Sequence, residues 1–367
     1  MRLSDVLPPG LLSQMEQTPQ DPIWHEEGNV RIHTERVCQA LKALPTWQRA
    51  DGTTQKILLL AAAFHDIGKP AATRQADGRW VSPGHARIGA GLARQILWRD
   101  FDLCGTPEKQ RLREAVCGLI RYHSLPSHAI DDADGMLRLR RAAANGELSP
   151  GFTIENLCVL SEADILGRIC PDQKPLLEKV QLCRELARDG SVLDAPYPFP
   201  SAHTAFACLA GRNVSPDFCL YDDTWGEVIL MSGLPGTGKD TWIREHLDLP
   251  MISLDEIRGE LGIPPTDPQG RVVDAATRRA KELLRRKQPF VWNATCITPQ
   301  TRARQIRLFT AYGASVKIVY LETSWAEQLR RNAGRRHSVP EIAISRMLEK
   351  LTPPERWEAH SVQWHCV

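Results

Sequence analysis

The sequence predicts a multidomain protein in which an all-α domain is followed by an α/β domain with a parallel sheet. In the first half, apolar residues recur with the period of buried helices. In the second half, short apolar runs alternate with charged helical segments, the order that a parallel sheet requires. Between the halves, Pro196, Pro198 and Pro200 interrupt every helical pattern. We therefore expect a helical domain over residues 1–195, a proline-rich connector over 196–225 and an α/β domain over 226–367.

The individual elements follow from these patterns. Helical patterns cover residues 37–44, 56–67, 86–97 and 114–123. The connector begins with a segment, 203–211, that has the pattern of a short helix. Strands are expected at 228–233, 251–253, 289–295 and 316–322.

Composition restricts the class of protein. Of 367 residues, 42% are apolar and 25% are charged, which is typical of a soluble globular chain. Because no run of 18 apolar residues occurs and the first ten residues lack a secretory pattern, we expect no membrane partner. The ten cysteines are scattered with no C-x-x-C pair, which favours reduced thiols and a cytoplasmic location.

Charge is divided unevenly along the chain. From residue 226 onward there are 21 Lys and Arg against 16 Asp and Glu, whereas the preceding part is slightly acidic. An acidic first part and a basic second part are typical of metal ligands in one and phosphate contacts in the other. Ordinary surface variation explains so small a difference equally well.

A histidine and an aspartate are adjacent at the end of an apolar helical segment. His65 and Asp66 follow residues 56–64, and Gly68 and Pro70 then stop the helix. Adjacent residues do not share a helix face, but at a helix end both side chains can turn toward one ion. Transition metals of intermediate softness accept this mixture of imidazole and carboxylate. The alternative is a buried core histidine whose hydrogen bonds are satisfied.

Other candidate ligands lie in helical, partly apolar sequence, where an isolated charge or imidazole is costly without a partner. They are His33, His85, His123 and Asp164.

These residues resemble the defining set of the HD-superfamily phosphohydrolases, which is a first His, a His-Asp doublet and a distant Asp. The resemblance covers residues 25–170, and the segments around His85 and His123 further resemble the HD domains of bacterial tRNA nucleotidyltransferases. It implies that one divalent transition metal (Mn, Co, Ni, Fe or Zn) is bound and that the extra histidines complete a second site. On this basis the metal ligands would be His33, His65, Asp66, His85, His123 and Asp164.

A metal in such a site suits phosphate chemistry, because a divalent ion lowers the pKa of bound water from about 15.7 toward about 7. Lys69, just past the doublet, and Arg168, after the last Asp, are both placed to meet a phosphate, and Lys69 is expected to be catalytic. Either residue is alternatively a solvated charge at a helix end. His25 either joins the site or lies on the surface.

Residues 228–242 contain a phosphate-binding P-loop. An apolar strand leads into a glycine-rich loop, and a helical segment follows. Such a loop turns backbone N–H groups toward a polyphosphate, and the helix presents its positive end to it. Lys239 would place its cation on the β- and γ-phosphates of ATP or another NTP. The expected nucleotide contacts here are Gly233, Pro235, Gly236, Thr237, Gly238, Lys239, Asp240 and Thr241.

One position departs from the usual pattern, because Asp240 replaces the Ser or Thr that normally follows the lysine. A carboxylate is a strong Mg²⁺ ligand, whereas its charge repels phosphate when no metal is present. We expect Asp240 to coordinate the Mg²⁺ of the nucleotide, with Thr241 capping the helix. The alternative is a decayed P-loop.

Two further segments of the second domain carry charge suited to phosphoryl transfer. Asp255 follows a short strand, at the edge where open α/β sheets bind ligands, and Arg258 comes three residues later. Asp255 is either a general base for an attacking hydroxyl or a helix N-cap. Residues 330–336 contain four arginines, which predict a lid over phosphates or, alternatively, a solvated basic turn.

Together, the P-loop and these segments resemble the 5′-OH polynucleotide kinase domain of phage and bacterial end-healing enzymes over residues 228–355. The resemblance implies that Lys239 binds ATP phosphates, Asp255 is the base and Arg258 contacts the substrate phosphate. It also implies a lid formed by Arg331 and Arg335, of which Arg335 stabilises the transferred group. Asn293 and Thr295 match the family pattern only loosely.

The two halves together resemble bacterial HD–polynucleotide kinase fusions. That resemblance implies hydrolysis of 2′,3′-cyclic or terminal phosphate at one strand end, phosphorylation of the 5′-OH at another, RNA or DNA ends as substrate, and a separate ligase partner. One alternative is a nucleotide phosphohydrolase fused to a nucleoside or small-molecule kinase. Another is a regulatory HD fold coupled to an ATP-binding switch. No aromatic base-stacking platform is evident in the sequence, so phosphate contacts are expected to carry the affinity.

Overall fold

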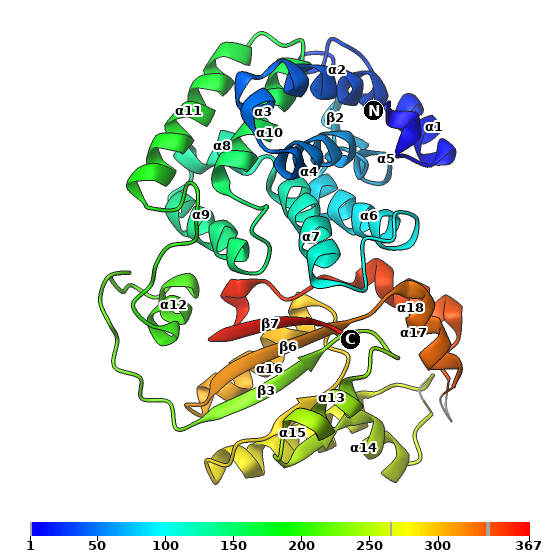
Figure 1. Ribbon diagram of the computed structural model, residues 1–367, viewed down its shortest axis with the longest axis vertical. Helices are drawn as coiled ribbons and strands as arrows, with labels where there is room; N and C mark the ends of the chain where they lie inside the picture. Colours follow the sequence, from blue (N-terminus) through cyan, green and yellow to red (C-terminus); the bar gives the residue numbers. More distant parts are fainter. Residues whose placement is uncertain (1, 265, 335–337) are drawn as a thin grey trace. The chain divides into compact units, whose positions relative to one another are not determined.

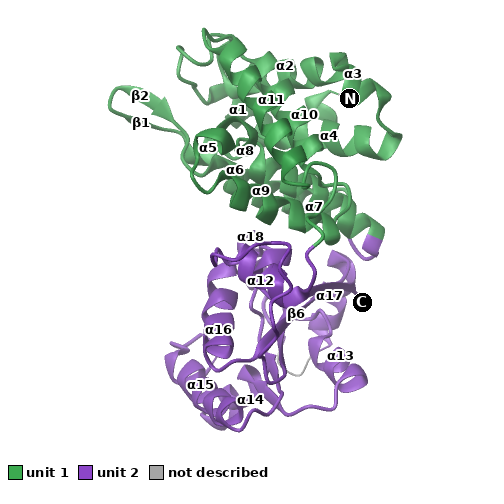
Figure 2. Ribbon diagram, turned by 90° about the vertical axis from the view of Figure 1, so that its left-hand side faces the viewer, with its two compact units in different colours: residues 1–103, 108–198 green, residues 104–107, 199–367 purple. Residues whose placement is uncertain are grey.

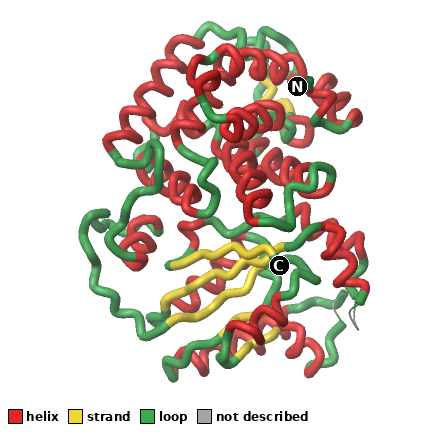
Figure 3. Tube along the Cα trace, in the orientation of Figure 1, coloured by secondary structure: helices red, strands yellow, loops and turns green. Residues whose placement is uncertain are grey.

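The computed structural model describes residues 2–264, 266–334 and 338–367. The chain forms two compact units, one of residues 1–103 and 108–198 and the other of residues 104–107 and 199–367 (Figure 2). The first unit is helical and the second contains a parallel sheet (Figure 3), so the predicted fold class is confirmed. Among the described residues, no helix is both long and apolar enough to cross a bilayer.

In its described residues, the first unit is a bundle of α-helices with three short 3-10 turns. The α-helices are α1 (Pro9–Gln17), α2 (Val30–Ala43), α3 (Pro45–Arg49), α4 (Gly52–Phe64), α5 (Lys69–Ala72), α6 (His85–Arg99), α7 (Pro107–Tyr122), α8 (Leu125–His128), α9 (Gly135–Ala144), α10 (Ile154–Gly167) and α11 (Gln173–Asp189). The 3-10 turns are η1 (Leu3–Asp5), η2 (Ala129–Asp131) and η3 (Asn145–Glu147).

Helices α2, α4 and α10 form the centre of this unit and pack against one another. Asp51 caps α4 by accepting hydrogen bonds from two backbone N–H groups, and the last turns of α4 are buried on all sides. A Cβ on Gly167 would lie 2.9 Å from the Val37 backbone nitrogen, so only glycine lets the end of α10 lie this close to α2. These contacts bring three candidate ligand segments together.

A two-stranded hairpin interrupts the helices and was not predicted. Strands β1 (Arg74–Ala76) and β2 (Arg79–Val81) pair antiparallel around Asp77 and Gly78. Both turn residues have positive φ, 50° and 75°, as a tight two-residue hairpin turn requires. The Asp-Gly pair was the available signal, and the hairpin projects from the unit beside α5 (Figure 2).

Among the described residues, the second unit is built on a five-stranded, fully parallel sheet in the order β4-β5-β3-β6-β7. Strands β3, β6 and β7 are seen side by side in Figure 1. Its last strand, β7, is an edge strand that the apolar pattern did not predict. The strands are β3 (Glu227–Ser232), β4 (Met251–Ser253), β5 (Val291–Asn293), β6 (Ser315–Glu322) and β7 (Ser361–Cys366).

Helices lie on both faces of the sheet, with α13 and α16 on opposite faces (Figure 2). The helices are α12 (Ala202–Leu209), α13 (Lys239–His246), α14 (Leu254–Glu260), α15 (Gly270–Arg285), α16 (Pro299–Ala311), α17 (Trp325–Ala333) and α18 (Glu341–Lys350), with the 3-10 turn η4 (Arg356–Glu358). From β3 the chain runs to β4 at one edge of the sheet, returns to β5 between β4 and β3, and then crosses to β6 on the other side of β3. The carboxyl end of β3 is therefore a topological switch point, where such sheets bind ligands.

Candidate functional site

The histidine-aspartate doublet lies in the turn between α4 and α5. A Cβ on Gly68 would lie 2.1 Å from the carbonyl oxygen of His85 and 2.5 Å from the nitrogen of Gly89. Only glycine therefore allows this turn to lie against the start of α6. The close approach brings the doublet next to His85, which opens that helix.

Three histidines of the site are held in the same orientation by the backbone. The Nδ1 of His65 lies 2.8 Å from the carbonyl oxygen of Ala62, and the Nδ1 atoms of His85 and His123 each lie 2.7 Å from the carbonyl three residues earlier. A carbonyl oxygen only accepts hydrogen bonds, so each Nδ1 carries the hydrogen. In the neutral ring, Nε2 then carries the lone pair, which is the form in which imidazole binds a metal.

The Nε2 atoms converge in two pairs around Asp66. His33 and His65 bring their Nε2 atoms within 3.4 Å, and those of His85 and His123 approach to 3.3 Å. Asp66 Oδ2 faces the first pair, at 3.6 Å from His33 Nε2 and 3.2 Å from His65 Nε2. Its other oxygen, Oδ1, lies 3.4 Å from His85 Nε2. The carboxylate is thus shared between the two pairs.

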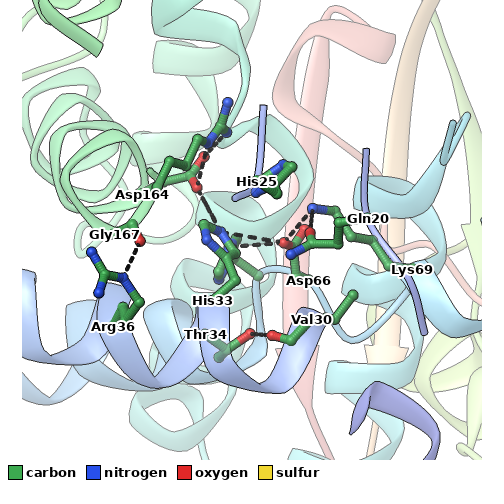
Figure 4. Close-up of polar contacts among 12 residues, drawn as sticks. Gln20, His25, Val30, His33, Thr34, Arg36, Asp66, Lys69, Asp164 and Gly167 are labelled. Carbon is green, nitrogen blue, oxygen red and sulfur yellow. Dashed lines mark hydrogen bonds and ion pairs between the residues drawn. The ribbon is translucent and has the colours of Figure 1, made fainter. Parts of the chain in front are cut away.

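Asp164, on α10, lies beside the first histidine pair. Its Oδ1 lies 3.0 Å from His33 Nε2, and its Oδ2 accepts a hydrogen bond from Arg168 (Figure 4). Burial raises the pKa of Asp164, but the adjacent Arg168 cation and His33 lower it well below its usual range. The same balance lowers the pKa of Asp66, where burial is opposed by His65 and Lys69. Both carboxylates are therefore held ionised.

Glu27 is a member of the site that the sequence did not point to. Its buried side chain places Oε1 2.8 Å from the Nδ1 atoms of both His33 and His25. Its Oε2 accepts a hydrogen bond from the Ile169 backbone N–H. Burial raises the pKa of Glu27, but His25 and His33 lower it well below its usual range. Glu27 thus faces His33 Nδ1 with a carboxylate oxygen, where His65, His85 and His123 face a backbone carbonyl.

Lys69 and Arg168 both line a cavity of about 300 Å³ above this group. The Lys69 ammonium lies 2.7 Å from Asp66 Oδ2 and donates a hydrogen bond to Gln20 (Figure 4). Lys69 is buried, so it is not a solvated helix-end charge. His25 lines the same cavity, and burial lowers its pKa to about 4, which keeps it neutral at pH 7.

The donor set fits a divalent transition metal. Asp66 Oδ1 is buried and has no hydrogen-bond donor among the residues that the structure describes. A buried carboxylate oxygen without a donor is costly, and imidazole lone pairs that face each other repel unless a cation lies between them. Neutral imidazole with carboxylate suits Zn, Fe, Ni, Co or Mn. Residues that could hold an ion form two groups around Asp66 and a third around Glu27: His33, His65 and Asp66; Asp66, His85 and His123; His25, Glu27 and His33.

The P-loop of the second unit follows β3 directly. Gly233, Gly236 and Gly238 have φ of 146°, 86° and 85°, values that L side chains rarely adopt. A Cβ on Gly233 would also lie 2.4 Å from the carbonyl oxygen of Leu321. Lys239 begins α13 and donates hydrogen bonds to the carbonyls of Gly233 and Leu234. The loop is thus shaped to wrap an anion, with its lysine folded onto its own backbone.

Asp240 is exposed in the first turn of α13. Its Oδ1 accepts a 2.6 Å hydrogen bond from Asn293, the last residue of β5. Gly238, not Thr241, is the N-cap of α13, so the expected capping role of Thr241 is wrong. The Thr241 hydroxyl instead accepts a hydrogen bond from Arg244 in the same helix. Thr237 and Pro235 belong to the loop, and the buried Thr237 hydroxyl donates to Leu234.

Asp255 lies in the first turn of α14, beyond β4. Ser253 caps that helix, so the N-cap alternative for Asp255 is wrong. The exposed Asp255 carboxylate forms an ion pair with Arg258. Arg331, at the end of α17, approaches the P-loop, since a Cβ on Gly238 would lie 3.3 Å from its Nη1. Arg335, the other expected lid residue, lies outside the described residues.

Comparison with known proteins agrees with this division. Residues 30–168 match the family described as HD domain, and residues 228–354 match the family described as AAA domain. The chain therefore has a first part that is similar to HD domains, followed by a part with a P-loop that is similar to AAA domains.

Individual relatives match smaller parts of the chain. A CC-adding tRNA nucleotidyltransferase from Thermus thermophilus is 43% identical over 68 residues, which are 17% of this chain and 14% of that protein. Among solved structures, a gluconokinase from Sinorhizobium meliloti 1021 is 22% identical with a TM-score of 0.29, covering 38% of this chain and 82% of its own. The identity and the TM-score of the gluconokinase are too low for an inference about the substrate of this chain.

Proposed function

We propose that this protein heals broken nucleic-acid ends through two separate sites. The HD domain hydrolyses a 2′,3′-cyclic phosphate or a terminal phosphate, and the P-loop domain transfers the γ-phosphate of ATP or another NTP to a 5′-OH. A separate ligase then joins the ends. The observation that carries the proposal is a shared-carboxylate histidine centre, with two cations in its cavity, in the same chain as a P-loop.

In the HD domain, the chain's own groups suit phosphate hydrolysis. A divalent ion bound there would lower the pKa of water and withdraw charge from a phosphoryl oxygen. Lys69 and Arg168 supply positive charge at the cavity wall, where a phosphate binds. Hydrolysis adds water across one P–O bond, so a cyclic phosphate opens to a monoester and the departing ribose oxygen takes a proton.

In the P-loop domain, phosphoryl transfer requires rearrangement of two side chains. Lys239 must exchange the carbonyls of Gly233 and Leu234 for nucleotide phosphates. Asp255 must turn from Arg258 toward the acceptor hydroxyl, whose proton it would take as general base. Asp255 is exposed, as a large acceptor such as a strand end requires. The similarity of the HD part to a tRNA nucleotidyltransferase further favours a polynucleotide substrate.

The test uses an oligonucleotide with a 5′-OH and a 2′,3′-cyclic phosphate, incubated with ATP and each of several divalent ions. We expect both ends to change in the wild-type protein. Asp66→Ala should abolish opening of the cyclic phosphate and preserve phosphorylation of the 5′-OH. Lys239→Ala should do the reverse, so each variant is the folding control for the other.

Two outcomes contradict the proposal and identify its alternatives. Phosphorylation of a nucleoside with no transfer to the oligonucleotide would indicate a small-molecule kinase. Nucleotide binding by a protein whose HD domain retains no metal would indicate a regulatory module. Metal analysis of the purified protein and comparison of the two acceptors separate these outcomes.

A further inference from the structure

Two tryptophans line the HD cavity beside the metal-binding residues. Trp24 and Trp80 lie in its wall together with Asp66, Lys69 and Arg168. Trp24 is 37% exposed and Trp80 is half-buried, so both rings are accessible from solvent. An exposed tryptophan that carries no core packing is an unusual wall for a cavity otherwise suited to phosphate.

Trp80 is held in place through the unexpected hairpin. It lies in β2 opposite Gln75, two residues before Ser82. The Ser82 hydroxyl contacts that of Thr73 at 2.8 Å, which closes the base of the hairpin. The Ser82 carbonyl is also the acceptor for His85 Nδ1. The strand that carries Trp80 is therefore linked to one of the metal-binding imidazoles.

Trp24 is held from the other side by a tight turn. The backbone N–H groups of Trp24 and His25 both donate to the Asp21 carbonyl, and Ile23 N–H donates to the Asp21 side chain. His25 in turn is bound to Glu27, whose carboxylate also faces His33. The backbone segments that carry both tryptophans are thus linked to residues of the centre, which favours a preorganised binding site.

We propose that Trp24 and Trp80 form a base-stacking subsite for the terminal nucleotide whose phosphate is hydrolysed. The proposal rests on the proposed hydrolase function. A molecule that carries both a phosphate and a planar ring matches a cavity lined by metal-binding residues, two cations and two tryptophans. Stacking tolerates every base, because each has a π-face, so the subsite selects a nucleotide end without selecting its sequence.

The experiment compares two strands with a terminal 2′,3′-cyclic phosphate, one with a normal last nucleotide and one in which the last ribose lacks its base. Hydrolysis is measured for the wild-type protein, Trp24→Ala, Trp80→Ala and the double variant. We expect each alanine variant to raise KM for the normal strand about tenfold and the double variant to raise it further. kcat should stay unchanged, as should KM for the base-free strand.

Two controls separate stacking from structure. Trp24→Phe and Trp80→Phe should keep most of the affinity, because a smaller ring still stacks. Ile23→Ala alters an exposed neighbour of Trp24 that does not line the cavity and should leave KM unchanged. Bound metal should be the same in all variants, since none removes a ligand.

Each remaining outcome is decisive. The stacking subsite is wrong if the wild-type protein hydrolyses both strands with the same KM. It is also wrong if the alanine variants raise KM equally for the normal and the base-free strand. In either case the hydrolase function stands. If the metal-loaded wild-type protein hydrolyses neither strand, the hydrolase function itself fails. A KM that rises only for the base-bearing strand supports both.

Discussion

The centre in the HD domain and the phosphate site of the P-loop domain differ in how far they are organised without a ligand. In the HD centre, His33, His65, Asp66 and Asp164 are at most 3% exposed, and each is held by a further protein group. In the P-loop domain, Asp240 and Asp255 are exposed, and Lys239 is bonded to its own loop. The HD centre is therefore preorganised for its ligand, whereas the side chains of the P-loop site must rearrange to bind theirs.

The difference follows from what each site must bind. A small ion binds most tightly to donors already in place, because none of its binding free energy is then spent on ordering side chains. A nucleotide with its acceptor is large and must enter and leave each cycle, so exposed and exchangeable contacts suit it. Changes in the HD centre should therefore be severe and local, whereas changes in the P-loop domain should depend on ligand and metal concentration.

The largest effect is expected for Asp66→Ala, which removes the carboxylate that both histidine pairs share. Bound metal should fall at both groups, and phosphate hydrolysis should fall by roughly 1,000-fold, because metal-ion catalysis contributes several kcal/mol. Elemental analysis and a hydrolysis assay measure the two losses. Lys239→Ala is the control and should retain full metal content. If Asp66→Ala leaves the metal stoichiometry unchanged, Asp66 is not a shared metal ligand, and the HD centre is not the preformed metal site that distinguishes it from the P-loop.

Next is Glu114→Ala, which tests how the histidine pairs are held. Glu114 is buried on α7 and forms ion pairs with Arg94 on α6 and with Arg113. It thereby joins the helices that carry His85 and precede His123. Removing one partner of a buried pair should destabilise this unit by about 3–5 kcal/mol. Hydrogen exchange of the α6 and α7 amides measures the change.

The exposed pair of Lys179 and Asp131 provides the control for Glu114→Ala. Asp131→Ala should change stability by about 1 kcal/mol or less. The pKa of Glu114 also has a consequence: burial raises it, but Arg94 and Arg113 lower it below its usual value. The stabilisation it provides is present above the pKa of an unfolded glutamate and is lost as pH falls through the folded value. If Glu114→Ala and Asp131→Ala reduce stability equally, the buried ion pairs of Glu114 stabilise the protein no more than an exposed pair does.

Asp240→Ala should have a smaller, condition-dependent effect in the P-loop domain. We expect phosphoryl transfer to fall by about 100-fold at low Mg²⁺ and to recover in part as Mg²⁺ is raised, because the carboxylate contributes to metal binding. Asn293→Ala, which removes only the partner of Asp240, should shift the Mg²⁺ requirement less. Steady-state kinetics over a Mg²⁺ series measure both. Full activity with an unchanged Mg²⁺ requirement would contradict a ligand role for Asp240.

The smallest effect is expected for Glu27→Gln. An amide still fits the space but cannot hold His33 as a carboxylate does, so metal affinity should fall by about 10- to 100-fold with the stoichiometry retained at high metal. Competition with a chelator measures affinity without reference to activity. Glu26→Gln changes the exposed neighbour and is the matched control. If both variants behave like the wild-type protein, Glu27 is not a positioning residue.

Sequence reasoning reached the fold class because it depends on local patterns. Helical periodicity, the proline cluster and the alternation of strands with helices all lie within short windows. The hairpin and β7 were missed for a related reason. Each strand of the hairpin has three residues, too few to show an alternation, and β7 is a partly exposed edge strand whose apolar pattern is weak.

For the sites, the sequence identified candidate residues by their type, such as histidine and aspartate as metal ligands. The structure brings the six histidine and aspartate candidates of the HD domain into one cluster. It missed Glu27 because the contacts of Glu27 depend on the fold, which brings residues 25–27 against His33 and Ile169. It likewise missed the contact between Asp240 and Asn293, which are 53 positions apart. Partners of this kind cannot be read from spacing, because helix packing and strand order create them.

The division of the two Asp66 oxygens between two histidine pairs has a consequence for titrations with metal. An ion in one group draws electron density from the carboxylate and repels a second ion in the other group. Loading is therefore expected to be anticooperative, with one tight and one weaker step. By linkage, each occupant weakens the other by the same factor, whichever binds first.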